Sequence, residues 1–305
     1  MLPSQRKTLR CVRPLRYRAA VTVLEVIQRS AEFLQRHSVE SPRLQIELLL
    51  AHLLKLPRLQ LYLNHDRELT ETELADLRAL VLRRAKREPL QHLVGSTAFF
   101  GLEITVSPDA LIPRPETETL VELALANLAK CASPRPAALD SGTGTGCIAL
   151  ALAAKNSAVQ VHALDISSTA LALAQRNAAQ HGLAGRITFH LGDGFAALPA
   201  DLRFDLVVSN PPYIPAAEIA TLQPEVRDFD PHLALDGGTD GLDFYRRLAT
   251  EAPARLNAGG GLYAEFGDGQ EDAIERIFAE AGWGNVAVHR DLSGRPRVVE
   301  AWRTA

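Results

Sequence analysis

The sequence predicts an α/β protein: a small all-helical segment, followed by a mostly parallel sheet with helices on both faces. Two observations support this prediction. From about residue 116 onward, short apolar strand patterns alternate with helical patterns, the order that builds a parallel sheet. Before residue 88 the apolar residues recur at helical spacing. The 305 residues, 47% hydrophobic and 23% charged, suit one large or two modest domains of a soluble globular protein.

Residues 1–20 form a basic extension. They contain six Lys or Arg and no acidic residue, so the net charge of −3 leaves −9 on the remainder. We expect either a disordered extension from an early start codon or an organellar transit peptide, which is arginine-rich and poor in acids. The acidic remainder is poorly suited to sliding on duplex DNA, which needs many Lys and Arg contacts to phosphates. We therefore expect no direct nucleic-acid partner.

The three cysteines indicate a reducing compartment. Cys11, Cys131 and Cys147 are odd in number and widely spaced, without a CxxC motif, which argues against a disulfide framework or a zinc site. No apolar run is long enough to span a bilayer or resembles a signal peptide. We expect a cytoplasmic monomer without metal or membrane association, or an organellar one if residues 1–20 are a transit peptide.

Residues 21–88 are predicted to form a helical bundle. Ser41 is predicted as an N-cap, and Pro42 occupies the first helical position of "PRLQIELLLAHLL". Thr70 and Glu73 form a capping box ahead of a leucine-rich face. The segment carries no evident chemistry, so we expect a packing domain or, alternatively, a domain that docks a partner.

Residues 89–115 are predicted to be a β-hairpin linker, because they combine glycines and prolines with short alternating stretches. Residues 116–305 form the second domain. Its predicted strands are "PAALD", "VQVHALD", "ITFHL", "FDLVVS", "GLYAEF", "VAVHR" and "RVVEAW", the last expected to be antiparallel.

A glycine loop joins the first of these strands to a helix. Gly142, Gly144 and Gly146 allow a ligand to approach the backbone closely, and the helix N-terminus offers free N–H groups. A dinucleotide fingerprint, GxGxxG, would need glycine where Cys147 stands. The pattern GxGxG therefore favours S-adenosylmethionine over NAD, and Asp140 suits a positive charge nearby.

Two further acids follow the next strands. Asp165 ends the second strand, where a carboxylate can accept hydrogen bonds from both ribose hydroxyls of either cofactor. Asp193 follows the third strand and could bind the adenine amine, or serve only as a turn residue. The predicted cofactor-binding residues are Asp140, Gly142, Thr143, Gly144, Thr145, Gly146, Asp165, Asp193, Gly194 and Asn210.

The stretch "VVSNPPYIP" ends the fourth strand in a rigid corner that we predict to be catalytic. The Asn210 side-chain carbonyl and the Pro211 backbone carbonyl, held in direction by Pro212, could each accept a hydrogen from a planar –NH₂ group. Two such acceptors would orient the nitrogen toward a methyl donor. Tyr213 would form an aromatic wall beside it. The motif predicts methylation of a planar nitrogen, either of a glutamine or of a base.

These residues resemble the HemK/PrmC family of N5-glutamine methyltransferases, which modify peptide-chain release factors. The resemblance covers nearly all the chain after residue 21, through "SPRLQIELLLAHLL", "REPLQHLVGSTAFFG", "LIPRPETE", "DSGTGTG", "NPPYIP" and "DLSGRPRVV". "IPRPETE" is similar to the release-factor branch rather than the ribosomal-protein branch. The resemblance implies a Rossmann-like seven-stranded class I S-adenosylmethionine-dependent methyltransferase domain after the helical bundle. It also implies that the glutamine of a Gly-Gly-Gln loop enters the pocket of Asn210 to Tyr213.

The match is incomplete at two positions, and two linker residues have uncertain roles. Ser141 stands where the family usually has an aliphatic residue, and Gly194 where many members carry a bulky residue beside the adenine. Phe100 and Arg114 match the linker motif and are predicted to bind substrate. Their alternative roles are hairpin core for Phe100 and a structural salt bridge for Arg114.

Other functions remain open at this point. A nucleic-acid adenine N6-methyltransferase uses the same tetrapeptide logic, and a ribosomal-protein glutamine methyltransferase shares the family. A binding module without activity is disfavoured by the intact Asn210 to Tyr213 motif. An NAD-dependent oxidoreductase is disfavoured by Cys147.

Overall fold

The computed structural model describes residues 21–303; the predicted basic extension 1–20 lies outside them. The chain divides into two compact units, one ending at Lys86 and one beginning at Arg87. Within residues 21–303, no helix combines the length and the apolar character needed to cross a membrane.

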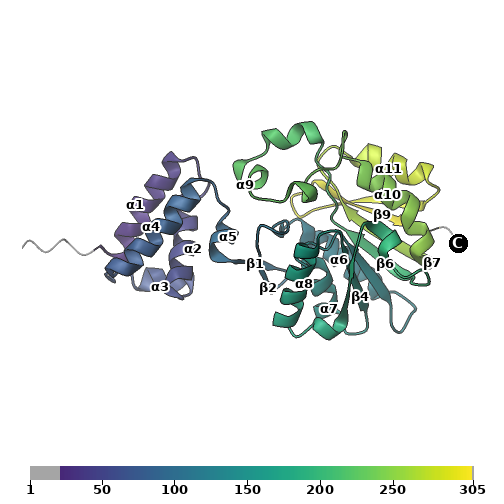
Figure 1. The fold of residues 1–305 in the computed structure, drawn as a ribbon, viewed down its shortest axis with the longest axis horizontal. Coiled ribbons are helices and arrows are strands. Elements are labelled where there is room, and N and C mark those ends of the chain that lie inside the picture. The colour runs from purple at the N-terminus through teal and green to yellow at the C-terminus, as the bar shows by residue number, and fades with distance from the viewer. Residues whose placement is uncertain (1–20, 304–305) are drawn as a thin grey trace, which may run out of the picture. The chain divides into compact units, whose positions relative to one another are not determined.

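The first unit is a bundle of helices around an apolar core, coloured purple to blue in Figure 1. Its helices are α1 (Val23–Arg36), α2 (Pro42–Leu54), α3 (Arg58–Leu63) and α4 (Glu71–Ala85). Leu34, Ile46 and Leu77 are essentially inaccessible to solvent at its centre. The helical prediction for this segment is therefore confirmed, because its apolar residues face one another at the spacing of 3.6 residues per turn.

The helix starts show one confirmed cap and one wrong cap. The Thr70 side chain accepts a hydrogen bond from the backbone N–H of Glu73 at 3.2 Å, and the Glu73 carboxylate accepts from the N–H of Thr70 at 2.9 Å, as predicted. Pro42 begins α2, but Ser41 makes no side-chain cap. Its backbone is left-handed (φ 47°, ψ 49°), whereas a capping hydroxyl reaches the first turn from an extended backbone.

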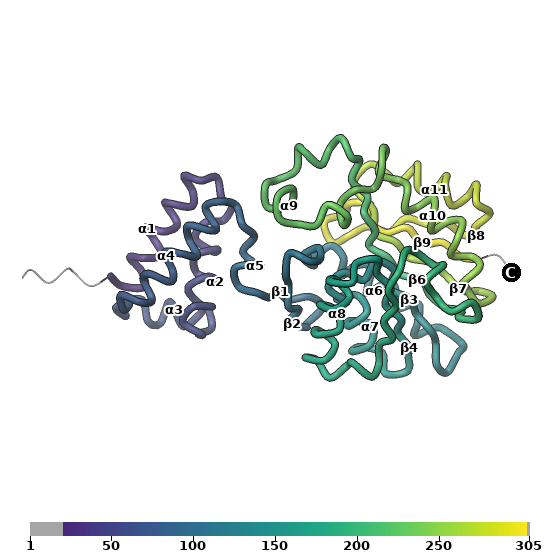
Figure 2. The backbone as a smooth tube through the Cα atoms, in the orientation of Figure 1, coloured from purple at the N-terminus to yellow at the C-terminus, as the bar shows by residue number. Residues whose placement is uncertain are grey.

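The second unit opens with a short helix and a hairpin. The predicted linker begins with α5 (Leu90–Val94), which the sequence reading missed, followed by antiparallel β1 (Ser96–Phe99) and β2 (Leu102–Thr105). Phe100 and Gly101 form the turn and both have positive φ, 49° and 78°, as expected in tight hairpin turns. The hairpin lies beside α8 (Ser168–Gln180) in Figure 2.

A seven-stranded sheet forms the body of the second unit. Its spatial order is β5–β4–β3–β6–β7–β9–β8, with six strands parallel and β9 antiparallel to both neighbours. The strands are β3 (Ala137–Ser141), β4 (Gln160–Asp165), β5 (Ile187–Leu191), β6 (Phe204–Ser209), β7 (Leu256–Glu265), β8 (Gly284–Arg290) and β9 (Pro296–Trp302). The predicted antiparallel last strand is confirmed; it inserts between β7 and β8.

Helices cover both faces of the sheet (Figure 1). One face packs on α6 (Thr117–Leu128) and α7 (Cys147–Lys155), and the other on α10 (Asp243–Glu251) and α11 (Glu271–Glu280). The alternation of side chains along β6 divides the core: Leu206 and Val208 join the first apolar cluster, and Val207 joins the second. The short helix α9 (Pro224–Arg227) lies in the segment between β6 and α10.

The strand order reverses between β3 and β6. In open α/β sheets, such a reversal leaves a crevice beyond the carboxyl ends of the two strands, where ligands bind. The residues that directly follow β3 and β6 therefore lie beside this crevice.

Candidate active site

Four candidate residues lie in one row across the carboxyl rim of the sheet. The register pairs Ser141 with Leu164 on β4, Asp140 with Val208 on β6, and Ser209 with Ala264 on β7. The next positions therefore bring together Asp165, Gly142, Asn210 and Glu265 from four neighbouring strands. The Ser209 hydroxyl also donates to the Ser141 carbonyl at 2.7 Å, which joins the ends of β3 and β6.

The glycine loop has the backbone that only glycine adopts freely. Gly142, Gly144 and Gly146 have φ of 77°, 55° and 81°. A Cβ at Gly142 would meet no atom within 4 Å, and one at Gly144 would meet only the Ala110 methyl at 3.9 Å. Gly146 differs, because a Cβ there would lie 2.9 Å from that of Ala174. The first two glycines leave open space for a ligand, and the third allows α7 and α8 to pack.

Asp140 is completely buried beneath this loop. One of its oxygens accepts from the Thr143 hydroxyl at 2.6 Å and from the Ala149 N–H at 3.1 Å. Its other oxygen, Oδ1, is buried without a hydrogen-bond partner among the described residues. Burial raises the pKa of Asp140 to about 7. An unpartnered carboxylate oxygen under an open loop fits a ligand that carries a positively charged donor.

The two threonines of the loop are buried as well. The Thr143 hydroxyl is committed to Asp140, and the side chain of Thr145 is 2% exposed. Any contact that these residues make with a cofactor must therefore come from their backbone. Their inclusion in the cofactor site stays a prediction.

Asp165 closes the loop from the neighbouring strand. Its two oxygens accept from the backbone N–H groups of Gly144 and Ser167, both at 2.8 Å. Burial raises its pKa, while the N–H bonds oppose that shift. A carboxylate has about four acceptor positions, so two remain for the predicted ribose hydroxyls.

Asp193 is held by an arginine that the sequence did not reveal, and the same arginine lies over Gly194. Arg247 on α10 donates to Asp193 at 2.9 Å, and the Asp193 side chain is 64% exposed. A Cβ on Gly194 would lie 2.4 Å from the Arg247 guanidinium. Arg247 thus fills the space that a side chain at position 194 would occupy. Contact of Asp193 with an adenine stays a prediction.

Asn210 lies at the end of β6 with one end of its amide occupied. Its Nδ2 donates to the Thr117 hydroxyl at 3.1 Å, and that hydroxyl donates to Glu265 at 2.7 Å. Among the described residues, nothing donates to the Asn210 side-chain carbonyl or to the Pro211 carbonyl. Neither predicted acceptor is therefore engaged by a donor within the described residues.

Tyr213 forms a wall at the same corner. Its ring lies against Gly267, where a Cβ would approach ring carbons at 3.0 and 3.4 Å. The Tyr213 carbonyl accepts from the Gln270 side chain at 2.9 Å, which anchors the stretch from Pro211 to Tyr213. Burial, together with the Glu265 carboxylate, raises the pKa of Tyr213 well above its usual range. The Tyr213 hydroxyl is therefore neutral, and its role as an aromatic wall stays a prediction.

The two linker candidates have structural partners. Arg114 donates to the buried Asp230 at 2.6 Å, which ties the linker to the segment after β6. The Phe100 ring packs on the core at α6 and α7, with the Lys155 ammonium 5.7 Å from its centroid. Both contacts favour the alternative roles of salt bridge and hairpin core, and direct contact with substrate stays a prediction.

Sequence reasoning missed three buried polar residues: Thr117, Glu265 and Asn177. Glu265 ends β7 at the carboxyl rim, and that position was a signal that could have identified it. Asn177 lies mid-helix in α8 and is completely buried. Its side chain bonds the backbone of Thr105 in both directions at 3.0 Å and donates to the Thr145 carbonyl at 2.9 Å. It thereby ties the hairpin to the glycine loop.

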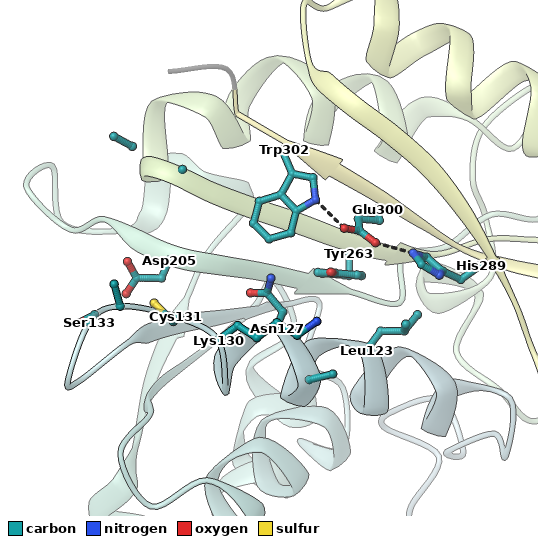
Figure 3. A pocket seen from close by; sticks show the side chains of 14 residues that line it. Leu123, Asn127, Lys130, Cys131, Ser133, Asp205, Tyr263, His289, Glu300 and Trp302 are labelled. Atoms are coloured by element: carbon teal, nitrogen blue, oxygen red, sulfur yellow. Dashed lines mark hydrogen bonds and ion pairs between the residues drawn. The ribbon is translucent and has the colours of Figure 1, made fainter.

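A separate cavity of about 630 Å³ lies between α6 and strands β7 and β9. Figure 3 shows the Glu300 carboxylate between the indole of Trp302 and the imidazole of His289, both at 2.5 Å. The lining includes Asp205, near the start of β6, and none of the candidate residues. The cavity is therefore distinct from the rim where Asn210 lies. Within residues 21–303, no three His, Cys, Asp or Glu residues are arranged to hold a metal ion.

Comparisons with known proteins identify domain families and relatives of the chain. The PrmC N-terminal domain model matches residues 25–95, and the methyltransferase small domain model matches residues 119–226. The chain is 47% identical to the release factor glutamine methyltransferase of Geobacter sulfurreducens over 91% of this chain and 95% of that protein. It is 42% identical to the one of Rhodospirillum rubrum over 94% of this chain and 87% of that protein.

Solved structures support the fold. The catalytic domain of hMettl16, solved with an RNA hairpin, superposes with a TM-score of 0.56 at 18% identity, covering 80% of this chain and 85% of that one. At that identity the likeness concerns the fold alone, and it confirms the predicted α/β methyltransferase architecture. The matches to these relatives extend over more than nine tenths of this chain. The chain belongs to the family of release factor glutamine methyltransferases.

Proposed function

We propose that this protein transfers a methyl group from S-adenosylmethionine to the side-chain amide nitrogen, N5, of the glutamine in the Gly-Gly-Gln loop of peptide-chain release factors. The methylation would tune translation termination. The observation that supports the proposal best is the row at the sheet rim: a ligand cradle at Gly142 and Gly144 lies one strand away from two unoccupied acceptors, the Asn210 side-chain and Pro211 carbonyls.

The residues at the rim suit the cofactor. S-adenosylmethionine, when bound, supplies an electrophilic methyl group on a cationic sulfonium. Gly142 and Gly144 would leave room for it, Asp165 has acceptor positions for ribose hydroxyls, and the unpartnered oxygen of Asp140 suits a positively charged donor. Asp193 and Gly194, held by Arg247, would border the adenine.

The chain's own contribution to the reaction would be to hold and activate the amide. An amide nitrogen is a weak nucleophile because its lone pair is delocalised into the carbonyl. The Asn210 and Pro211 carbonyls would each accept one N–H bond, which holds the nitrogen in line with the methyl group. As the nitrogen forms its new bond its hydrogens become more acidic, so the same two hydrogen bonds strengthen in the transition state. Tyr213 would flank the planar amide.

Docking, compartment and oligomeric state are proposed as well. Residues 21–88 would dock the release factor. The free cysteines Cys131 and Cys147 suit a reducing cytoplasm, and we propose a monomer without nucleic-acid or membrane partners. An adenine N6-methyltransferase remains the second candidate, because two carbonyl acceptors would also hold an exocyclic base amine.

Mass spectrometry tests the proposed function. A purified release factor is incubated with the enzyme and S-adenosylmethionine, and the Gly-Gly-Gln peptide is expected to gain one methyl group on the glutamine. A release factor whose glutamine is replaced by alanine should stay unmodified. An unmodified wild-type peptide, under conditions where calorimetry shows cofactor binding, would refute the proposal. Faster methyl transfer to RNA, DNA or a ribosomal protein would favour the corresponding alternative.

A further inference from the structure

Asn210 is linked to a buried carboxylate through a single hydroxyl group. Thr117, the first residue of α6, lies between the Asn210 amide and Glu265, the last residue of β7. Thr117 is 2% exposed and Glu265 is 1% exposed, so water does not compete for these contacts. The three residues come from elements separated by 93 and 148 positions in sequence. Only the folded sheet brings them together.

The number of donor hydrogens on Asn210, Thr117 and Glu265 sets the direction of the hydrogen bonds between them. A threonine hydroxyl has one hydrogen to donate, whereas an ionised carboxylate can only accept. The Thr117 hydrogen is therefore committed to Glu265, at 2.7 Å, and its oxygen can only accept toward Asn210. Of the two ends of the Asn210 amide, only the NH₂ group can donate to that oxygen. The carbonyl end is left facing away from Thr117.

We propose that Thr117 and Glu265 are positioning residues that set which end of the Asn210 amide meets the substrate. This inference rests on the proposed function, in which the Asn210 carbonyl accepts a hydrogen from the glutamine amide. If Asn210 were reversed, its NH₂ group would face the substrate NH₂ group, and two donors would oppose each other. The rigid corner at Pro211 and Pro212 holds the backbone but does not set the orientation of the side-chain amide. The hydrogen bonds from Asn210 through Thr117 to Glu265 set it.

Neighbouring charges set the pH range in which Glu265 is ionised and Thr117 must donate to it. Burial raises the pKa of Glu265 to about 7, hydrogen bonds from Thr117 and Tyr213 and the charge of Arg297 lower it, and the Glu116 carboxylate raises it. The Tyr245 hydroxyl also packs there and donates to the Glu265 backbone carbonyl at 2.6 Å. Below pH 7 Glu265 takes up a proton and can donate to Thr117. The Thr117 hydrogen is then free to turn toward Asn210, and the preference for one orientation is lost.

Substitutions at Thr117 separate positioning from packing. Thr117→Val removes the hydroxyl and keeps the branched shape, so kcat for a release factor should fall about 10- to 100-fold while KM changes little, as expected for a transition-state hydrogen bond. Thr117→Ser keeps the hydroxyl and should stay within about threefold of wild type. Cofactor affinity and thermal unfolding identify any variant that fails to fold.

Glu265→Gln tests the direction of the relay. A glutamine amide can donate to Thr117, so kcat of the variant should fall about tenfold at pH 8. In wild type, kcat should decrease between pH 8 and pH 6 as Glu265 takes up a proton. In Glu265→Gln this decrease should largely disappear. Glu300→Gln is the control, because it removes a partly buried carboxylate from the adjacent strand, paired in register with Tyr263, outside the candidate site. It should keep both the rate and the pH profile of wild type.

An activity-independent measurement completes the test. The side-chain amide hydrogens of Asn210, assigned by NMR with Asn210→Ala, should shift and exchange faster with water in Thr117→Val, and remain unchanged in Glu300→Gln. The inference would be overturned if Thr117→Val and Glu265→Gln kept the wild-type kcat and pH profile. It would also be overturned if the Asn210 signals did not move in Thr117→Val. A wild-type enzyme that methylates no glutamine would refute the proposed function instead, and the NMR signals would still decide the orientation.

Discussion

At the scale of single residues, the candidate site depends on which atoms are already occupied. The Asn210 Nδ2 is bonded to Thr117, while its carbonyl and that of Pro211 have no donor among the described residues. Asp140 and Asp165, in contrast, each bond the glycine loop through one oxygen. The same rim therefore holds a rigid loop beside two free acceptors, and these two parts should respond differently to substitution.

Asn210→Ala should abolish catalysis and spare the cofactor site. The substitution removes one acceptor from the substrate amide, so we expect kcat to fall by about two to four orders of magnitude. Affinity for S-adenosylmethionine, measured by calorimetry, should stay within about threefold, because the glycine loop keeps its own hydrogen bonds. Turnover equal to wild type would show that Asn210 does not hold the reacting nitrogen.

At the scale of secondary-structure elements, polar side chains join elements that the core does not. Asn177 on α8 bonds both the β2 backbone and the glycine loop, and Arg114 joins the linker to the segment after β6 through Asp230. The first set of contacts ties the hairpin to the glycine loop, and the second ties the linker to the segment after the central strand β6. The loops at the rim are thus held by a few hydrogen bonds, each of which is open to a direct test.

Asn177→Ala should loosen the hairpin and the glycine loop together. The change leaves the Thr105 N–H and carbonyl and the Thr145 carbonyl without their partner, which should lower the free energy of unfolding by about 2 to 4 kcal/mol. Hydrogen exchange should rise in both β2 and the loop. Gln175→Ala, at an exposed position on the same helix, is the control and should change neither. Faster exchange in only one of the two segments would contradict a shared clamp.

At the scale of the whole molecule, buried carboxylates make stability depend on pH. Burial raises the pKa of Asp140 to about 7 from an ordinary value of 3.8, so the folded protein keeps a proton that the unfolded chain has already lost. Folding therefore binds protons between about pH 4 and pH 7. It follows that the contribution of Asp140 to stability is fully present below pH 4 and is lost as the pH rises through 7.

Asp140→Asn should remove this dependence. The difference in unfolding free energy between wild type and variant should change by about 3 to 4 kcal/mol between pH 4 and pH 8, with wild type relatively more stable at the acidic end. Urea unfolding at several pH values measures it. Asp201→Asn, at an exposed position, serves as the control and should run parallel to wild type. A difference that does not vary with pH would exclude a proton held on Asp140.

Much of the architecture could be read from local patterns. Strand and helix periodicities, the Thr70 capping box and the antiparallel last strand were all predicted and confirmed, because each depends on residues close together in sequence. The Ser41 cap was wrong and α5 was missed, because a backbone dihedral and a five-residue helix leave little trace in sequence. The glycine loop and the Asn210 to Tyr213 corner could be proposed from sequence because the residues of each are contiguous, and their roles stay predictions.

The sequence by itself determined the α/β class, the family resemblance and the two motifs at the strand ends. Only the tertiary structure decided that Thr117 and Glu265 reach Asn210, that Arg247 occupies the space above Gly194, and that Asn177 ties the hairpin to the loop. The physical reason is that a buried hydrogen bond joins whichever donor and acceptor the packing brings within 3 Å. That distance is set by strand register and helix placement, not by separation along the chain.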